Sequence, residues 1–175
     1  MTIFLLGLIT IVRSLAPGEA VDWTVHLRRS GPVQMGMSVN EVRRVLADPM
    51  AYLAYADREP DGSACAYLQS AFKPSPLGFM FQKGRLVRID VYEPGIRTAS
   101  GATVGDTEDK IKQLYPGRIT VEPHHYLPEN GHYLNYRAVD PQDRGYGMVF
   151  ETEDGRVTSF RVGTLSAIAL VEGCS

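Results

Sequence analysis

The feature that most constrains the fold is a pattern of elements that occurs twice, about 70 residues apart. In each copy a capped helix, over residues 38–46 and then 107–115, precedes a meander of strands. Each meander ends in a hairpin, and the hairpins turn at residues 83–84 and 154–155. The pattern predicts an α+β fold made of two tandem repeats, each a helix plus an antiparallel sheet.

Both predicted helices begin at a residue type that caps helices well. Ser38 precedes the first helix, and Glu41 three residues later completes a capping box. Thr107 takes the same place before the second helix, which Pro116 ends. Apolar residues recur at helical spacing in both segments, so each helix is expected to pack one face against its sheet. The first strand of the first meander is expected over residues 64–71.

The first twenty residues read as a targeting segment. Residues 3–12 form an apolar run too short to cross the roughly 30 Å hydrocarbon core of a membrane, but long enough for a signal-peptide core. Gly18 and Ala20 predict cleavage after Ala20. We therefore expect a signal peptide over 1–20, a first helix/sheet repeat over 21–100 and a second over 101–175. Because no basic residue precedes the run, a buried first strand or helix is the alternative.

The chain has two cysteines, Cys65 and Cys174. An even number of cysteines in an exported protein predicts a disulfide bond, here between Cys65 and Cys174. No C-x-x-C spacing suggests a zinc site or a thioredoxin-type pair. Together with the signal peptide, the cysteines predict a periplasmic or secreted protein with no stable membrane span once the signal is removed.

Strand alternation suggests a polar sheet face as the binding surface. In the first hairpin the apolar residues Val87, Ile89 and Val91 share one face, and Thr158, Phe160 and Val162 take the matching places in the second. The opposite, polar face is predicted to be exposed and to bind a partner through Arg88, Asp90, Tyr92, Ser159 and Arg161. A loop carrying His124, Tyr126 and Tyr133 is expected at its rim. An ordinary solvated sheet face is the alternative.

A family resemblance rests on the first helix and the strands after it. Residues 36–46 read as a glycine followed by Met and Ser, then x-x-Glu-Val and a helix ending in Leu, before a strand meander. This resembles the periplasmic modules shared by beta-lactamase inhibitory proteins, which carry two tandem copies, and the outer-membrane assembly lipoprotein BamE. The resemblance covers residues 32–162. It implies a concave sheet that binds another protein, or a scaffolding role, although the lipidation cysteine of BamE is missing here.

A second resemblance is carried by three short segments, residues 88–91, 123–126 and 172–174. These are similar to segments of uncharacterised exported bacterial proteins, some of which carry a lectin label. The resemblance implies the same exported location and adds a carbohydrate ligand as an alternative, but it assigns no functional residue.

These observations favour a non-catalytic protein of the cell envelope that engages a protein partner through an exposed sheet face. The alternative is a lectin-like carbohydrate-binding module, in which Tyr126, Tyr133 and Tyr136 would stack on sugars. A hydrolase is least favoured, because the chain lacks a G-x-S-x-G or phosphate-binding motif. A net charge of −2 and short basic dipeptides argue against nucleic acid. No cofactor is predicted and no metal, although His124, His125 and His132 leave a metal site open as a minor alternative.

Overall fold

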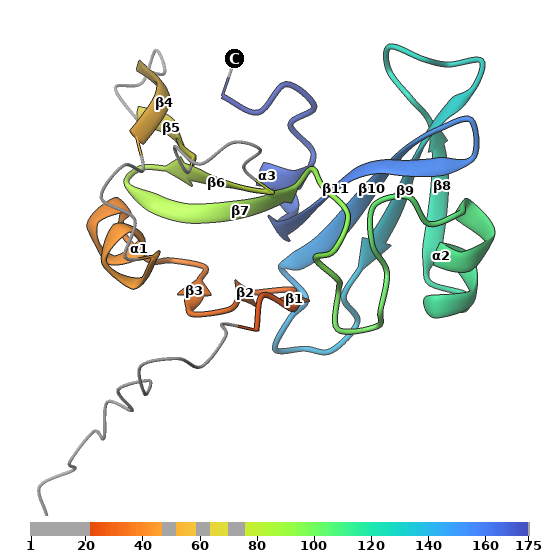
Figure 1. Ribbon diagram of the computed structural model, residues 1–175, viewed down its shortest axis with the longest axis horizontal. Helices are drawn as coiled ribbons and strands as arrows, with labels where there is room; N and C mark the ends of the chain where they lie inside the picture. Colours follow the sequence, from red (N-terminus) through yellow and green to blue (C-terminus); the bar gives the residue numbers. More distant parts are fainter. Residues whose placement is uncertain (1–21, 47–51, 59–63, 70–75, 175) are drawn as a thin grey trace, which may run out of the picture.

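The computed structural model describes residues 22–46, 52–58, 64–69 and 76–174, with the backbone alone for 52–58, 64 and 69. The predicted signal peptide, 1–20, lies outside the described residues. The described part is α+β, as predicted, with an eight-stranded sheet, a three-stranded sheet and three helices (Figure 1). No helix in it is long and apolar enough to span a membrane.

The elements follow one another in an order that repeats a helix and four strands. The small sheet comes first and is formed by β1 (Val25–His26), β2 (Arg29–Ser30) and β3 (Val33–Gln34). Next come α1 (Val39–Leu46), β4 (Tyr52–Arg58), β5 (Ala64–Gln69), β6 (Leu77–Gln82) and β7 (Arg85–Val91). The second half has α2 (Glu108–Leu114), β8 (Ile119–Pro123), β9 (Gly131–Arg137), β10 (Tyr146–Glu153), β11 (Arg156–Thr164) and α3 (Leu165–Ile168).

The large sheet is antiparallel throughout, with the order β4-β5-β6-β7-β11-β10-β9-β8. The strands of each half therefore pair with their neighbours in the chain, and within the large sheet the two halves are joined by the pairing of β7 with β11. Figure 1 shows this junction at the middle of the molecule. The sequence did not predict β4, which precedes the expected first strand.

The predicted helix caps are confirmed. The backbone N–H and the hydroxyl of Ser38 both donate to the Glu41 carboxylate at 2.8 Å, and the Glu41 N–H donates back to Ser38 Oγ at 3.3 Å. At α2, Thr107 Oγ1 accepts from the N–H of Lys110 at 3.2 Å. These bonds satisfy backbone groups that a helix N-terminus otherwise leaves unpaired, and so they fix where each helix begins.

The segment before each helix is joined to the hairpin of its own half by the same backbone contact. The N–H of Gly36 donates to Leu86 O at 2.8 Å, and the N–H of Gly105 donates to Val157 O at 2.8 Å. Both hairpins turn where predicted. The first turn residues, Lys83 and Asp154, have φ of 51° and 50°, and a glycine follows each, as a type I′ turn requires.

A β-bulge in each hairpin shifts the predicted alternation by one residue. Phe81 pairs with Leu86 and Met80 with Arg88, which leaves Val87 as the extra residue. In the second hairpin, Thr158 is the extra residue in the same position. The prediction that Val87 and Thr158 face the core is therefore wrong: Leu86 and Val157 take those places. Ile89, Val91, Phe160 and Val162 face the core as predicted.

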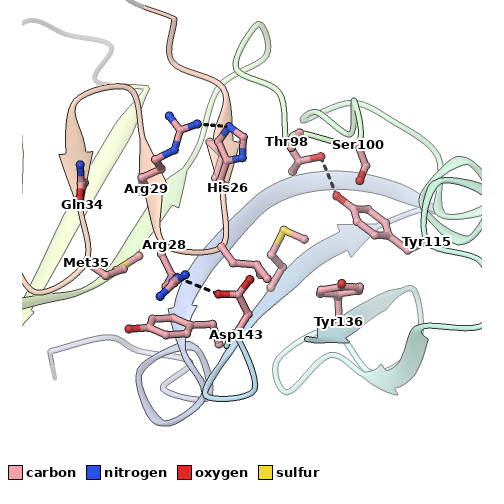
Figure 2. A pocket seen from close by; sticks show the side chains of 15 residues that line it. His26, Arg28, Arg29, Gln34, Met35, Thr98, Ser100, Tyr115, Tyr136 and Asp143 are labelled. Carbon is pink, nitrogen blue, oxygen red and sulfur yellow. Dashed lines mark hydrogen bonds and ion pairs between the residues drawn. The ribbon is translucent and has the colours of Figure 1, made fainter. Parts of the chain in front are cut away.

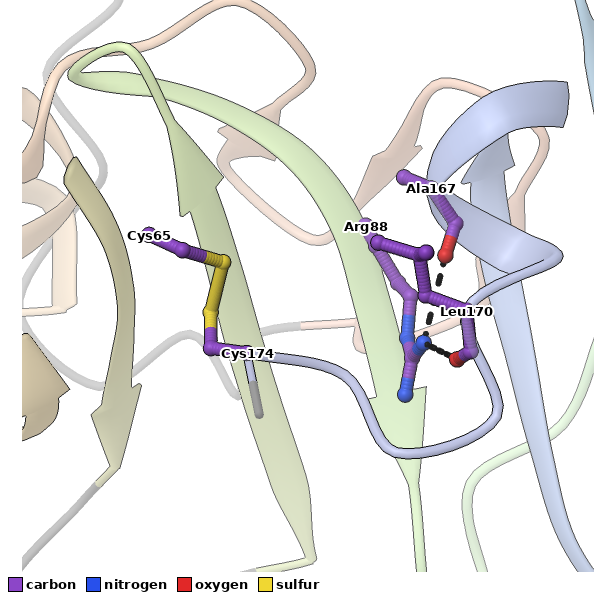
Figure 3. The surroundings of a disulfide bond; sticks show 5 residues. All are labelled: Cys65, Arg88, Ala167, Leu170 and Cys174. Atoms are coloured by element: carbon purple, nitrogen blue, oxygen red, sulfur yellow. Dashed lines mark hydrogen bonds between the residues drawn. A yellow bond between two sulfur atoms is a disulfide. The ribbon is translucent and has the colours of Figure 1, made fainter. Parts of the chain in front are cut away.

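The two faces of the large sheet are covered differently. One face, here called the core face, carries the main hydrophobic core, to which the helices α1 and α2 and the small sheet contribute. The other, the tail face, lies under α3 and the C-terminal segment 169–174 (Figure 1). The predicted disulfide is confirmed: Cys174 is bonded to Cys65 in β5, across 109 residues of sequence (Figure 3). It fixes the end of the chain to the tail face.

Candidate functional site

A cavity of about 640 Å³ opens on the core-face side of the molecule, and we call it the β1 pocket. Its walls come from the small sheet, the loop at residues 98–100, and side chains of β9 and β10 (Figure 2). The volume lies within the range of about 300–1,000 Å³ that is usual for ligand pockets. This cavity is the candidate functional site.

The small sheet is held in place as one wall of the β1 pocket by backbone contacts. The N–H of Val25 donates to Arg97 O at 2.8 Å, and the N–H of Ala99 donates to Val25 O at 2.9 Å. β1 is thereby paired with the loop that connects β7 to α2. Ser30 is buried and its hydroxyl donates to Trp23 O at 2.9 Å, which ties β2 to the segment before β1. The wall is therefore built from the chain's own hydrogen bonds.

Aromatic side chains form the opposite wall. The rings of Tyr115 and Tyr136 lie 5.1 Å apart between centroids, and the Tyr115 hydroxyl lies 2.7 Å from Thr98 Oγ1. Burial raises the pKa of Tyr115, so this hydroxyl stays protonated. The side chains of Met35 and Met148 also line the cavity. The pocket thus offers a surface of rings and sulfur atoms on which apolar groups pack well.

Charged groups line the remaining wall. Arg28 Nε lies 2.8 Å from Asp143 Oδ1, and the guanidinium sits over the Tyr146 ring at 5.7 Å from its centroid. The neighbouring Arg29 donates to His26 Nε2 at 3.1 Å (Figure 2). The pocket therefore combines an aromatic surface with positive charge.

The predicted binding face is not exposed, and this part of the prediction is wrong. Arg88, Asp90 and Arg161 do lie together on one face, but only 4%, 3% and 5% of their surfaces are exposed. The segment 165–174 covers them. Arg88 Nη1 donates to the carbonyls of Ala167 and Leu170, at 3.2 and 2.6 Å (Figure 3).

Beneath this cover the buried charges are paired. Arg88 Nε and Nη2 lie 2.8 and 2.7 Å from Asp90 Oδ1. Arg161 is paired with Glu151, and its Nε donates to Ile168 O at 2.7 Å. Burial opposes the charge on Arg88, but the adjacent Asp90 outweighs it and raises the pKa of the guanidinium; burial also raises the pKa of Asp90. The cluster ties the tail to the sheet.

The other predicted site residues are spread around this cluster. Ser159 is half-buried and its hydroxyl donates to Glu151 at 3.4 Å. Tyr92 remains 41% exposed. In the loop predicted at the rim, Tyr126 is 56% exposed, whereas Tyr133 is buried and stacks on His124 at 4.5 Å between centroids. These residues leave no continuous open surface with Arg88 and Arg161.

The three histidines considered for a metal go to different partners. His132 Nδ1 lies 2.7 Å from Glu108 Oε1, His124 packs on Tyr133, and His125 packs edge-on against Tyr126. In the described part of the chain, no group of three or more His, Cys, Asp or Glu side chains is arranged to hold a metal ion.

Sequence reasoning missed the β1 pocket, because its residues come from segments that are far apart in the chain. No motif links Arg28, Tyr115 and Asp143 in the sequence. Of the residues proposed for sugar stacking, only Tyr136 lines the pocket. The alternation of Trp23, Val25 and Leu27 is the one local signal for a strand at this wall.

Comparisons with known proteins support the fold alone. No protein-family model matches the chain. No curated protein matches it in sequence. Among solved structures, the chain is similar to the crystal structure of the uncharacterized protein yfeY from Escherichia coli, with a TM-score of 0.52 and 12% sequence identity. The match covers 80% of this chain and 99% of that one.

Proposed function

We propose that the chain is a non-catalytic binding protein of the cell envelope that holds a segment of a protein partner in the β1 pocket. The observation that carries this proposal is the pocket itself, a 640 Å³ cavity whose wall is fixed by backbone bonds to Val25. Its tyrosine, methionine and arginine side chains are the types enriched where proteins bind one another. The pocket replaces the buried Arg88–Arg161 face as the partner site.

The predicted alternative, a carbohydrate-binding module, finds less support in the geometry. Tyr133 and Tyr136 lie on opposite faces of the sheet, because Tyr136 packs with the main core and Tyr133 packs beneath α3. Tyr126 lies in the loop next to Tyr133 and is exposed. The three rings therefore do not form one stacking platform, and a protein partner is the better fit.

We further propose that α1 with β4–β7 and α2 with β8–β11 are two copies of one unit. The same order of elements, the matching contacts of Gly36 and Gly105, and the bulges at Val87 and Thr158 support this. Tandem units are also what the resemblance to beta-lactamase inhibitory proteins implies. In that arrangement the β1 pocket is lined by side chains of the second unit and lies near the junction of the two units.

The proposed location is the periplasm or the outside of the cell. It rests on the apolar run at residues 3–12 and on the Cys65–Cys174 bond, because disulfides persist in oxidising compartments. N-terminal sequencing of the protein from cells tests it. A start at Val21 in an envelope fraction supports export, and an intact Met1 on protein from the cytosol contradicts it.

Site-specific photocrosslinking tests the partner site. A photoreactive residue at Gln34, which is exposed and lines the pocket, should capture a partner that the same residue at Glu122, exposed on β8, does not. The partner is then purified and its affinity measured. Ser100→Trp, which places a large ring at the pocket mouth, should weaken binding at least tenfold, with Tyr126→Ala as the matched control. Unchanged affinity of a folded Ser100→Trp protein would reject the pocket.

A further inference from the structure

We propose that the β1 pocket recognises a carboxylate attached to an apolar or aromatic group, with Arg29 as the donor that holds it. This inference rests on the proposed function, since it names the chemistry that the same pocket binds. It is supported by three observations: the charge balance of the wall, the free donors of one guanidinium, and the apolar surface beside them.

The charge balance of the pocket leaves Arg29 without a close anionic partner among the described residues. Arg28, by contrast, is paired with Asp143 at 2.8 Å. Asp22 interacts with Arg29 only through longer-range electrostatics, and its carboxylate accepts hydrogen bonds from the hydroxyl and N–H of Thr24 at 2.6 and 2.9 Å. Those bonds, and more weakly the nearby cationic side chains, lower the pKa of Asp22.

Arg29 keeps most of its hydrogen-bonding capacity for a ligand. A guanidinium has five N–H donors, and the described contacts of this one use a single bond, to His26 Nε2. That bond holds the guanidinium at the pocket wall while its other edge remains free (Figure 2). A planar fork of two donors matches the two oxygens of a carboxylate, so a bidentate pair is the interaction it favours.

The neighbouring surface suits an apolar group rather than a second charge. The side chains of Leu27, Met35 and Met148 and the ring of Tyr136 line the same cavity. Within the described structure the Tyr136 hydroxyl has no hydrogen-bond partner, so it is available to a polar atom of the ligand. A group that is apolar at one end and carboxylate at the other would satisfy both parts of the pocket at once.

Two sources carry this chemistry: the C-terminal end of a polypeptide whose last side chain is large and apolar, and a small aromatic or aliphatic acid. Both place one carboxylate next to one apolar group. The polypeptide end agrees with the proposed protein partner, because the preceding residues would continue out of the pocket mouth beside Ser100. The two sources differ in whether those residues add affinity, and this difference is measurable.

The test is a titration of the full mature chain, followed by NMR or calorimetry, with three probes. They are a six-residue peptide ending in Leu-Phe with a free carboxylate, the same peptide with a C-terminal amide, and N-acetylphenylalanine. We expect the free acid to bind at least tenfold more tightly than the amide. Arg29→Gln should remove this preference. Arg44→Gln, which removes the same charge from the exposed side of α1, should keep it.

The remaining outcomes distinguish failure of the carboxylate inference from failure of the proposed partner-binding function. A peptide acid that binds more tightly than N-acetylphenylalanine identifies a polypeptide end, and equal affinity identifies a small acid. If acid and amide bind alike, or if Arg29→Gln keeps the preference, the carboxylate inference is wrong while the pocket remains a binding site. If no probe binds, the inference is also wrong. Failure of the proposed function is recognised separately, by a partner that binds the Ser100→Trp protein unchanged.

Discussion

The core face and the tail face of the large sheet are stabilised in different ways. On the core face, Ile89, Phe150 and Phe160 are fully or almost fully buried among other apolar side chains. On the tail face, one residue along the strand from Ile89, the side chains are Arg88 and Asp90, and they are buried as deeply. Neighbouring residues of β7 are thus buried on both faces, but on the tail face the buried side chains are charged.

The difference shows what the tail contributes. Apolar side chains can be buried by many different apolar surfaces. The core face can therefore be covered by helices and by a small sheet, with a cavity at its side. Buried guanidiniums need specific acceptors. On the tail face these are the Asp90 and Glu151 carboxylates and the carbonyls of residues 167, 168 and 170. The tail therefore supplies some of the acceptors that the buried guanidiniums need. Its stabilising effect depends on where its carbonyls lie rather than on how apolar its side chains are.

The largest effect is expected from removing the disulfide that holds the tail. Changing Cys65 and Cys174 together to Ser should lower the free energy of unfolding by about 4–5 kcal/mol, because the bond closes a loop of 109 residues in the unfolded chain. Urea unfolding measures the loss, and the reduced wild-type protein should unfold with the variant. An unchanged midpoint after reduction would mean that the charged contacts alone hold the tail.

Neighbouring residues on opposite faces give the most direct comparison. Arg88→Ala should cost about 3–5 kcal/mol, because it leaves Asp90 buried without its cation. Ile89→Val, one residue away, should cost only about 0.5–1.5 kcal/mol. Replacing the pair by apolar residues, Arg88→Met with Asp90→Leu, should recover most of the loss in urea unfolding. A double variant as unstable as Arg88→Ala would show that the bonds to the tail, rather than the Asp90 charge, dominate.

A smaller effect concerns a carboxylate at the edge of the core face. Partial burial raises the pKa of Glu108, but hydrogen bonds from Thr152 and His132, both at 2.7 Å, outweigh it and hold the pKa below the usual 4.5. Because the folded pKa is the lower one, this stabilisation is present above about pH 4.5 and is lost as the pH falls through the folded value.

Glu108→Gln should therefore cost about 1 kcal/mol at neutral pH, the difference between a charged and a neutral hydrogen-bond acceptor. The cost should disappear in acid. Urea unfolding at pH 7 and at pH 3 measures both values, with Glu129→Gln, an exposed carboxylate elsewhere, as the control. A cost that is the same at the two pH values would show that the shape of the side chain, and not its charge, is what matters.

The smallest effect is expected at the rim of the β1 pocket. Arg28 and Asp143 form an ion pair that is 51% and 29% exposed, so Arg28→Gln should change the free energy of unfolding by no more than about 0.5 kcal/mol. Thermal unfolding checks this. A loss as large as that of Arg88→Ala would mean that Arg28 holds the small sheet in place as well as lining the pocket.

Local chemistry made much of the fold predictable. Ser38 with Glu41, the positions of the two hairpin turns and the cysteine pair each depend on a few residues or on a simple count, and each prediction is confirmed. The bulges at Val87 and Thr158 were missed, because alternation was counted back from Val91 and Val162 without a break, although Leu86 and Val87 are both apolar.

Long-range packing was the part that the sequence did not predict. Alternation correctly placed Arg88 and Arg161 on one face, but it cannot say what covers a face. Here the cover is a segment that arrives from the end of the chain. The β1 pocket was missed for the same reason, since Arg29, Tyr115 and Tyr136 meet only after the small sheet has docked.

The pairing of β7 with β11 has a consequence for how the chain reaches its native state. Every other neighbouring pair in the large sheet joins strands that are consecutive in the chain, whereas this one joins residues about seventy apart, such as Val91 and Phe160. Hairpins form within microseconds, but closing a long loop has a larger entropy cost and comes later. The backbones also meet closely there: a Cβ on Gly163 would lie 2.2 Å from Val87 O. We therefore expect Gly163→Ala to oppose the pairing of the two halves and to slow refolding, which stopped-flow measurements would show.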